Sequence, residues 1–416
     1  MSQQIVDVYA HWIPIREPLL IGHLSFSHTG RGGVFSFSYD PKFLASPYQL
    51  QIDPVLSLGS GDFFNDQADK NFRAFLDSSP DRWGRVLMQR RAVIEARKGL
   101  REDSRLTELD YLLGVHDSYR MGGIRFKKTN EDYFLDNNAD LSAPPMTSLR
   151  ELEVAAIRIE QDQDSESDEH YHWLSMLISP GSSLGGARPK ACVTDVNGDL
   201  WIAKFPNSND EWDVGAWEMV CHQLALKAGI EMSVCELRRL NSHHHTFLTK
   251  RFDREGESRR HFSSAMTQLQ YYDGDQSDGA SYLELAEFLS NHGSQTEKDL
   301  AQLWRRIVFN IAVSNTDDHL RNHGFLLDGR GWRLSPAYDI NPSVGINGLH
   351  LNITDTSNVL DYSLAFEVID FFRLSRDQAT AIYDEVLSAA ASWDRVATKL
   401  GISRSEQLVK ERAFHV

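Results

Sequence analysis

The stretch Asn315-Thr316-Asp317-Asp318-His319-Leu320-Arg321-Asn322-His323 is the densest polar cluster of the chain. It directly follows residues 297–313, in which apolar residues recur at the spacing of a helix with one buried face. A rigid helix that ends in a polar loop brings functional side chains to a fixed place. The sequence therefore predicts a functional loop at residues 315–323.

The spacing of this loop and of the segment after it suits one kind of chemistry. Asp317 and Asn322 lie five positions apart, and Asp339 follows in Ser335-Pro336-Ala337-Tyr338-Asp339, after a predicted hairpin at residues 324–334. Phosphoryl transfer to a hydroxyl needs a carboxylate that orients the nucleophile and oxygen ligands for magnesium nearby. The order of carboxylate, Asn, hairpin and second Asp is that of protein kinases, although an Asp and Asn at this spacing alone are common.

A glycine-rich segment precedes a second predicted hairpin. Gly181-Ser182-Ser183-Leu184-Gly185-Gly186-Ala187 is followed by strands expected at residues 191–194 and 200–205, joined by Asn197-Gly198, which favours a tight turn. Gly185 and Gly186 would let backbone N–H groups approach phosphate oxygens closely. The segment matches neither of the common phosphate-binding patterns, so a plain loop stays an alternative.

Two charged residues interrupt apolar faces in the same region. Lys204 shares a strand face with Leu200 and Ile202, and Glu218 lies on the apolar face of a helix expected at residues 211–228, closed by Gly229. A buried ammonium group is costly unless it is paired. We therefore predict that Glu218 holds Lys204 toward the phosphates of a nucleotide; the alternative is that both side chains reach solvent at an edge.

Three further residues are candidates for contact with the nucleotide. Lys190 precedes the first strand of the hairpin and either faces phosphate or ends a strand at the surface. Lys250 and Phe252 lie in Thr249-Lys250-Arg251-Phe252-Asp253-Arg254, where a hinge against an adenine ring is expected.

The composition restricts the class of protein. The 416 residues are too many for one ordinary core, so two or three lobes are expected. The formal net charge of −16 argues against direct nucleic-acid binding, and a basic partner would have to supply any DNA contact. Neither a signal peptide nor an apolar run of membrane-spanning length is visible, and Cys192, Cys221 and Cys235 lack ligand spacing. We expect a cytoplasmic protein with buried free thiols.

The rest of the chain suggests further elements. Residues 5–60 are typical of short strands, residues 72–96 of a helical region in which Pro80-Asp81 begins a helix, and residues 105–115 of helices. Polar residues 127–147 and acidic residues 160–169 indicate linkers, and the chain after residue 278 is expected to be mainly helical. The predicted fold class is α+β, with domains at residues 1–145, 146–254 and 255–416.

Taken together, five ordered blocks resemble the HipA family of bacterial toxin–antitoxin serine/threonine kinases. They are Ser183-Leu-Gly-Gly-Ala-Arg-Pro-Lys190, Ala203-Lys-Phe-Pro206, Lys250-Arg-Phe-Asp-Arg254 and the segments that hold Asp317 and Asp339. The stretch Ser78-Ser-Pro-Asp-Arg-Trp-Gly-Arg85 also resembles the N-terminal region of that family. The resemblance implies a protein-kinase-like bilobal fold with a mixed α/β N-lobe, a mainly α-helical C-lobe and an N-terminal β-rich subdomain.

The resemblance also implies roles for single residues. Asp317 would be the catalytic base, Asn322 and Asp339 would bind magnesium, and Lys204 would contact the ATP phosphates. Ser183 matches the autophosphorylated serine of the family, and Ser182 beside it could share that role, which would switch the enzyme off. At residue 250 this chain has lysine where an acidic residue is common in the family. Family members phosphorylate cellular proteins, including aminoacyl-tRNA synthetases, and are neutralised by a small DNA-binding antitoxin of the HipB type.

Two other functions remain open from the sequence. The chain could be a catalytically silent ATP-binding pseudokinase that serves as a scaffold for an antitoxin. It could also be a metal-dependent hydrolase, since His319 and His323 have the spacing of helical zinc ligands and stand beside Asp317 and Asp318. Residues 243–245, three consecutive histidines, are expected to form a polar turn between strands rather than a metal site.

Overall fold

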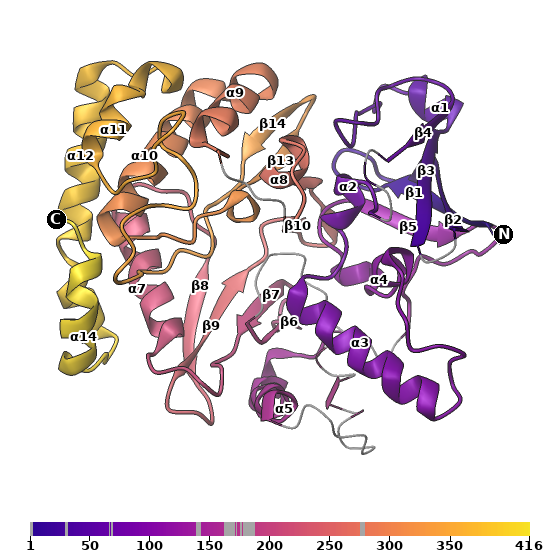
Figure 1. The fold of residues 1–416 in the computed structure, drawn as a ribbon, viewed down its shortest axis with the longest axis horizontal. Helices are drawn as coiled ribbons and strands as arrows, with labels where there is room; N and C mark the ends of the chain where they lie inside the picture. The colour runs from indigo at the N-terminus through magenta and orange to yellow at the C-terminus, as the bar shows by residue number, and fades with distance from the viewer. Residues whose placement is uncertain are drawn as a thin grey trace. The chain divides into compact units, whose positions relative to one another are not determined.

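The computed structural model describes residues 3–29, 32–65, 67, 70–138, 143–161, 171, 173–174, 177, 188–274 and 279–416 (Figure 1). The chain divides into two compact units. The first consists of Met1–Ser208 and Asp253–Ser263, and the second of Asn209–Phe252 and Ser264–Val416. The division into three domains expected from the sequence stays a prediction.

The first unit contains an antiparallel sheet of five strands in the order β4-β3-β2-β1-β5. In β3, Phe35, Phe37 and Tyr39 are buried while Ser36 and Ser38 are partly exposed, as the alternation in the sequence predicts. The strands are β1 (Gln3–Ala10), β2 (Leu19–Thr29), β3 (Gly32–Tyr39), β4 (Asp62–Phe64) and β5 (Ile124–Lys128).

Five described α-helices accompany this sheet in the first unit. The helical region predicted at residues 72–96 is two helices, because the chain turns before Asp81, whose carboxylate accepts a hydrogen bond from the Gly84 N–H (2.8 Å) and so begins a new helix. Helix α5 is absent from the sequence prediction. The helices are α1 (Pro41–Leu44), α2 (Arg73–Leu76), α3 (Arg82–Arg97), α4 (Glu108–Leu113) and α5 (Leu149–Gln161), with 3-10 turns η1 (Asp117–Tyr119) and η3 (Met146–Ser148).

The first unit also holds the predicted hairpin of β6 (Lys190–Thr194) and β7 (Leu200–Lys204). Its turn contains Gly198 at φ +81°, the left-handed conformation that glycine favours. Lys190 and Lys204 lie directly opposite each other in the register, so both side chains leave the same face of the hairpin. Two short strands follow, β10 (Arg254–Glu255) and β11 (Ser258–Arg259), and β12 (Phe262–Ser264) lies at the boundary between the units.

Lys190 is buried, and its ammonium group forms a 2.6 Å ion pair with Asp81. Lys190→Met should lower the free energy of unfolding by about 3–5 kcal/mol, because the Asp81 carboxylate would stay buried without its partner charge. Chemical denaturation measures this loss. Adding Asp81→Asn, which still caps helix α3, should recover most of it. A double variant as unstable as the single one would contradict this structural role.

His261 is also buried in the first unit, and its ring stacks on Trp12 at 4.5 Å. Burial lowers its pKa from 6.5 to about 3. Between these two values the unfolded chain binds a proton that the folded chain does not. The free energy of unfolding should therefore fall by about 1.4 kcal/mol per pH unit as the pH drops below 6.5.

The variant His261→Phe tests this linkage. It keeps the ring contact with Trp12 and lacks the titrating group, so its stability should drop less on acidification. We expect the difference in unfolding free energy between pH 7 and pH 5 to be smaller than that of the wild type by about 2 kcal/mol. Equal acid sensitivity of the two proteins would show that His261 titrates normally.

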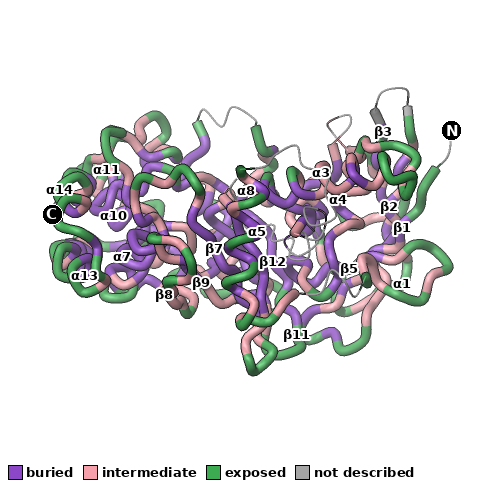
Figure 2. The backbone as a smooth tube through the Cα atoms, turned by 90° about the horizontal axis from the view of Figure 1, so that it is seen from below, coloured by how far each residue is buried: buried purple, intermediate pink, exposed green. Residues whose placement is uncertain are grey.

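Helix α10 lies in the interior of the second unit: Figure 1 shows it beside α11 and α12, and Figure 2 shows much of it in the colour of buried residues. This helix contacts α9, α12 and β14, and all its apolar residues from Leu300 to Val313 except Ala301 are fully buried. The α-helices are α7 (Val214–Lys227), α8 (Ala265–Gln268), α9 (Tyr282–His292), α10 (Thr296–Val313), α11 (Tyr362–Glu367), α12 (Arg376–Ala390), α13 (Trp393–Lys399) and α14 (Arg404–Lys410). The strands are β8 (Cys235–Arg239), β9 (His245–Lys250), β13 (Gly324–Asp328) and β14 (Gly331–Leu334), and the 3-10 turns are η4 (Leu320–Asn322), η5 (Ile369–Phe372) and η6 (Glu411–Ala413).

Several predictions for the second unit are confirmed. Helix α10 and the hairpin of β13 and β14 lie where the sequence placed them, and Gly229 follows α7 with φ +74°. Residues 243–244 lie between β8 and β9, as expected, whereas His245 is the first residue of β9 and its imidazole bonds to Asp213 (2.5 Å). Antiparallel sheets together with many helices confirm the α+β class.

The three cysteines are free thiols. Cys192 and Cys221 are buried as predicted, but Cys235 is half-buried, because the strand β8 that holds it is partly exposed along its whole length. Among the described residues, no helix is both long and apolar enough to cross a membrane.

Candidate active site

The polar loop begins where α10 ends. Ser314 closes the helix in the left-handed conformation, with φ +50°. The Asn315 side chain then donates to the Asn310 side chain (3.1 Å), one turn back on the helix. The buried helix therefore fixes the start of the loop.

Asp317 and Asn322 are joined within the loop. The Asn322 amide nitrogen donates to the Asp317 carbonyl oxygen (3.0 Å), and Asn322 is 4% exposed. Its side-chain oxygen is buried and accepts no hydrogen bond from the described residues. Asp317 is exposed although the residues on both sides of it are buried. One side chain thus faces solvent at the site, and the other has an oxygen available for a ligand.

The segment with Asp339 lies against the same loop. The Tyr338 hydroxyl donates to the Arg321 carbonyl (2.7 Å), and the Asn341 N–H donates to the Asn315 side chain (3.2 Å). Both flanks of Asp339 are therefore bonded to the loop of Asp317. Asp339 itself has φ +59°, a strained conformation for a residue other than glycine, and such strain is concentrated at functional sites.

A third segment contacts both parts of the site. The His415 imidazole lies 2.9 Å from the Ser314 hydroxyl, and the His415 backbone N–H donates to the Ala312 carbonyl (2.9 Å). The Lys410 ammonium donates to the Pro342 carbonyl (2.8 Å). Residues 410–415 thus help to fix the spacing of the two loops.

The carboxylates of Asp317 and Asp339 both act on the imidazole of His319. Burial lowers the pKa of His319, while the nearby carboxylates of Asp317 and Asp339 act to raise it. Both carboxylates therefore lie close enough to act on the same imidazole. The structure brings together Asp317, Asn322 and Asp339, as the sequence predicted.

The oxygen-bearing side chains of the two loops are of the type that magnesium prefers. The Asn322 side-chain oxygen and the Asp339 carboxylate are hard oxygen ligands, and Mg²⁺ in phosphoryl-transfer sites takes few protein ligands and completes its shell with phosphate and water. In the described ranges no cluster of three or more His, Cys, Asp or Glu side chains is arranged to hold a metal. The Asn322 and Asp339 side chains are nonetheless of the type that binds a magnesium ion.

The geometry contradicts the hypothesis that His319 and His323 bind zinc from one face of a helix. Residues 320–322 form a 3-10 turn rather than an α-helix, so His319 and His323 do not share a helical face. His323 is instead committed to Asp318 (2.8 Å). The helical-ligand spacing inferred from the sequence is wrong for this pair.

The residues predicted to bind the nucleotide fall into different parts of the chain. Ser182, Ser183, Gly185 and Gly186 lie outside the described residues. Lys204 is half-buried in the first unit, and Glu218 is buried on α7 in the second. Their ion pair stays a prediction. Lys190 is not a surface strand end, and its contact with phosphate also stays a prediction.

The predicted hinge segment has two distinct halves. In the second unit, the ring of Phe252 lies 5.7 Å from that of Tyr338, next to Asp339, while Lys250 is half-buried. In the first unit, the fully buried Asp253 accepts from the Gly122 N–H (2.8 Å).

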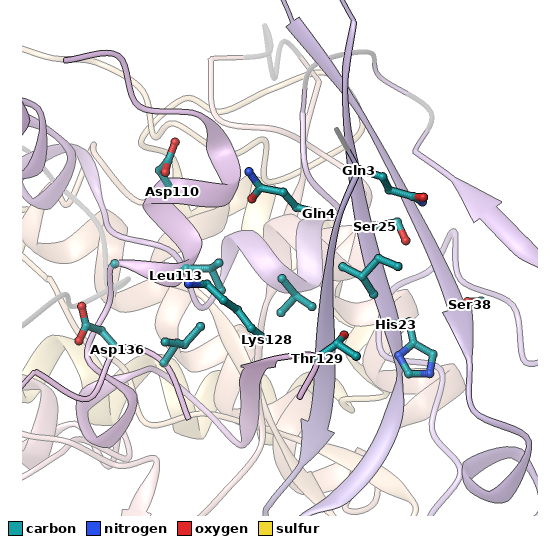
Figure 3. Close-up of a pocket in the computed structure, with 14 residues that line it drawn as sticks. Gln3, Gln4, His23, Ser25, Ser38, Asp110, Leu113, Lys128, Thr129 and Asp136 are labelled. Atoms are coloured by element: carbon teal, nitrogen blue, oxygen red, sulfur yellow. The ribbon is translucent and has the colours of Figure 1, made fainter. Parts of the chain in front are cut away.

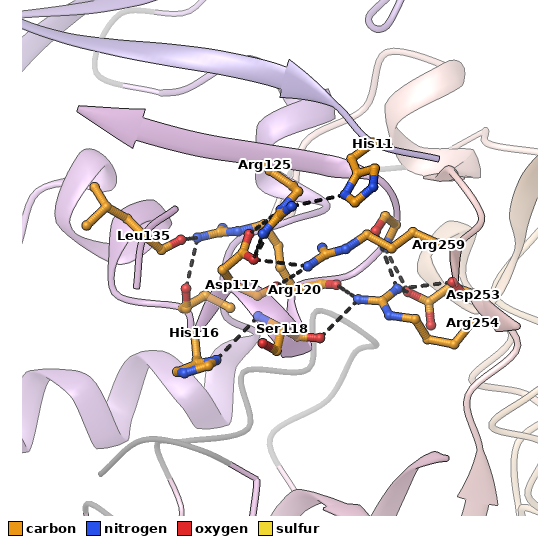
Figure 4. A network of polar contacts seen from close by, with 12 residues as sticks. His11, His116, Asp117, Ser118, Arg120, Arg125, Leu135, Asp253, Arg254 and Arg259 are labelled. Atoms are coloured by element: carbon orange, nitrogen blue, oxygen red, sulfur yellow. Dashed lines mark hydrogen bonds and ion pairs between the residues drawn. The ribbon is translucent and has the colours of Figure 1, made fainter. Parts of the chain in front are cut away.

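Arg254 donates to the Arg120 carbonyl (2.6 Å) in the same polar network, which Figure 4 shows. Asp117 joins that network through Arg125 and Arg259. Asp253 and Arg254, the second half of the hinge segment, therefore stabilise the fold of the first unit.

A separate cavity of about 1140 Å³ lies in the first unit, beside the five-stranded sheet (Figure 3). Its titratable residues already have partners: His23 bonds to Asp7, Lys128 to Glu131, Asp110 belongs to the capping box of α4, and Asp136 accepts from the Asn138 N–H. This cavity contains none of the predicted site residues.

A sequence profile described as the HipA-like C-terminal domain matches residues 182–393, just over half of the chain. This protein belongs to the HipA-like family. The matched residues include both loops of the site described above.

Two relatives extend this assignment. HipA of Shewanella oneidensis MR-1, solved with HipB and its operator DNA, has a TM-score of 0.67 at 15% identity, over 98% of this chain and 94% of that one. This likeness shows a shared fold. The Sinorhizobium fredii protein named "Putative kinase Y4dM" is 28% identical over 155 residues, which cover 34% of this chain and 37% of that relative.

Proposed function

We propose that this protein is an ATP- and Mg²⁺-dependent protein kinase that phosphorylates serine or threonine in a cellular protein. The observation that carries the proposal is the bonding of the Asp339 segment to the loop of Asp317 and Asn322. Membership of the HipA-like family and the likeness to the relatives named above support it.

Asp317 is the proposed catalytic base. Its exposed carboxylate would accept a hydrogen bond from the acceptor hydroxyl and orient the oxygen toward the γ-phosphorus. As the new oxygen–phosphorus bond forms, the bond to the β–γ bridging oxygen breaks, ADP leaves, and the hydroxyl proton passes to Asp317. The exposure of Asp317 among buried neighbours allows a macromolecular substrate to reach it.

Asn322 and Asp339 are the proposed ligands of magnesium, which when bound neutralises the charge on the phosphates. The hydrogen bond from Asn322 to the Asp317 backbone uses the side-chain nitrogen, which leaves the side-chain oxygen as the atom that would bind the metal. Lys204, supported by Glu218, is proposed to contact the phosphates, with Gly185, Gly186 and Lys190 on the same side of the nucleotide. Lys250 and Phe252 would lie near the adenine.

The toxin–antitoxin role belongs to the same proposal. The Shewanella relative forms a complex with HipB and operator DNA, and a HipB-like antitoxin is the proposed partner of this chain. A net charge of −16 favours a basic partner over direct DNA binding. We further propose that the protein autophosphorylates at Ser183 or Ser182 and that an aminoacyl-tRNA synthetase is one candidate substrate. The protein is proposed to act in the cytoplasm, and its three proposed domains are those defined from the sequence.

Incubation of the purified protein with radiolabelled ATP and MgCl₂ tests the proposal. We expect label on serine or threonine, mapped by mass spectrometry to the chain itself and to a protein of a cell extract. No label should appear without Mg²⁺. Release of free phosphate without protein labelling would favour a hydrolase, and ATP binding without either product would favour a silent scaffold.

A further inference from the structure

Asp318 has no role in the proposed chemistry, yet it is buried and hydrogen-bonded to three side chains. It is 4% exposed, and a single carboxylate oxygen accepts three hydrogen bonds. The donors are the Tyr282 hydroxyl (2.5 Å), the Asn310 amide (2.7 Å) and the His323 imidazole (2.8 Å). They come from α9, from α10 and from the residue that precedes β13.

Stability alone is a poor explanation for such a group. Burial of a carboxylate costs free energy that its partners barely recover, and apolar residues of similar volume often stabilise a fold as well. Burial would raise the pKa of Asp318, but the charge of His323 and the hydrogen bonds from His323 and Tyr282 lower it instead. The site therefore keeps a charged carboxylate in a buried position where its geometry is strongly defined.

The bond between Asp318 and His323 closes the loop on itself. The residues between them include Asn322, whose N–H donates to the His319 carbonyl (2.8 Å). Asp317 directly precedes Asp318, the first residue of the pair that closes the loop. The base and the proposed magnesium ligand thus lie at the two ends of a short loop whose ends are held together by one hydrogen bond.

We propose that Asp318 is a positioning residue that sets the distance between the Asp317 carboxylate and the Asn322 side-chain oxygen. Tyr282 and Asn310 connect it to the two helices beneath the loop, and His323 completes the closure. The inference rests on the proposed function, since it concerns the geometry of that same reaction. Misplacement of reacting groups by about 1 Å can lower a rate about a hundredfold.

The test compares Asp318→Asn with Asp299→Asn. Asp299 is equally buried and bonded, to Arg333 and to the Leu334 N–H, but it lies at the start of α10, away from the loop. Asp318→Asn should lower kcat about ten- to a hundredfold, leave KM for ATP within about threefold, and raise the Mg²⁺ concentration needed for half-maximal rate. Asp299→Asn should lose stability yet keep kcat.

Tyr282→Phe provides a milder second variant. It removes one donor and keeps the ring, so a several-fold fall in kcat is expected even if Asp318→Asn does not fold. The inference is overturned if the folded loop variants, compared at equal fraction folded, keep wild-type kcat and Mg²⁺ dependence, or if Asp299→Asn lowers kcat equally. If the wild type transfers no phosphate at all, the proposed kinase function itself is wrong. If the wild type is active and the variants are as active as the wild type, only the positioning role of Asp318 is wrong.

Discussion

Replacement of Asp317 by asparagine is expected to lower the rate of phosphoryl transfer about a hundred- to ten-thousandfold. Asparagine keeps the size of the side chain but cannot accept the proton of the acceptor hydroxyl. Because Asp317 is exposed, the free energy of unfolding should stay within about 0.5 kcal/mol of the wild type. Single-turnover labelling of protein with ATP measures the rate.

The matched control for this variant is Asp328→Asn. Asp328 is an exposed aspartate of the same unit, at the end of β13, and its removal changes the net charge by the same amount. It should transfer phosphate at the wild-type rate. The Asp317→Asn variant should still bind ATP with Mg²⁺, because Asp317 is not a proposed metal ligand. Wild-type transfer by Asp317→Asn would remove its assignment as the base.

Asp339→Asn should lower phosphoryl transfer by a similar factor, but by weakening the binding of Mg²⁺ and ATP rather than by removing the base. Loss of a metal-binding carboxylate is expected to weaken the affinity for Mg²⁺ and ATP together by more than about a hundredfold, since even residues that only support metal ligands contribute ten- to a hundredfold. Asparagine tolerates positive φ better than most residues, so the backbone at φ +59° should persist. Calorimetric titration with ATP and Mg²⁺ measures the loss.

Asp317→Asn and Asp339→Asn together separate binding from chemistry. The first should bind the nucleotide without transferring phosphate, and the second should lose binding. If Asp339→Asn binds ATP and Mg²⁺ like the wild type, the metal is held elsewhere, and the assignment of Asp339 is wrong.

Local sequence patterns were sufficient for much of the fold. The periodicity of residues 297–313 predicted α10 because a helix with one buried face repeats apolar residues every three to four positions. The alternation in residues 34–39 predicted β3, and Asn197-Gly198 predicted the turn between β6 and β7. Helix α5 was missed although Leu149, Leu152, Ala156 and Ile159 have helical spacing, because polar and acidic stretches on both sides suggested a linker.

The remaining interactions depend on residues far apart in the chain. Lys190 pairs with Asp81, 109 positions earlier, and no pattern around either residue indicates the other. Asp318 looked like a possible metal ligand beside Asp317. Its partner Tyr282 lies 36 positions away, so the hydrogen bonds that commit Asp318 to the fold become visible only when α9 and α10 are packed. The spacing of Asp317, Asn322 and Asp339 could be recognised because the proposed phosphoryl transfer constrains it.

A diffraction structure of the chain with a non-hydrolysable ATP analogue and Mn²⁺ in place of Mg²⁺ tests the shared site most directly. Anomalous scattering would locate the metal without ambiguity. We expect it to be bound by the Asn322 side-chain oxygen, the Asp339 carboxylate and phosphate oxygens, with the Asp317 carboxylate facing the γ-phosphate. A metal and nucleotide bound away from these three residues would contradict the kinase assignment.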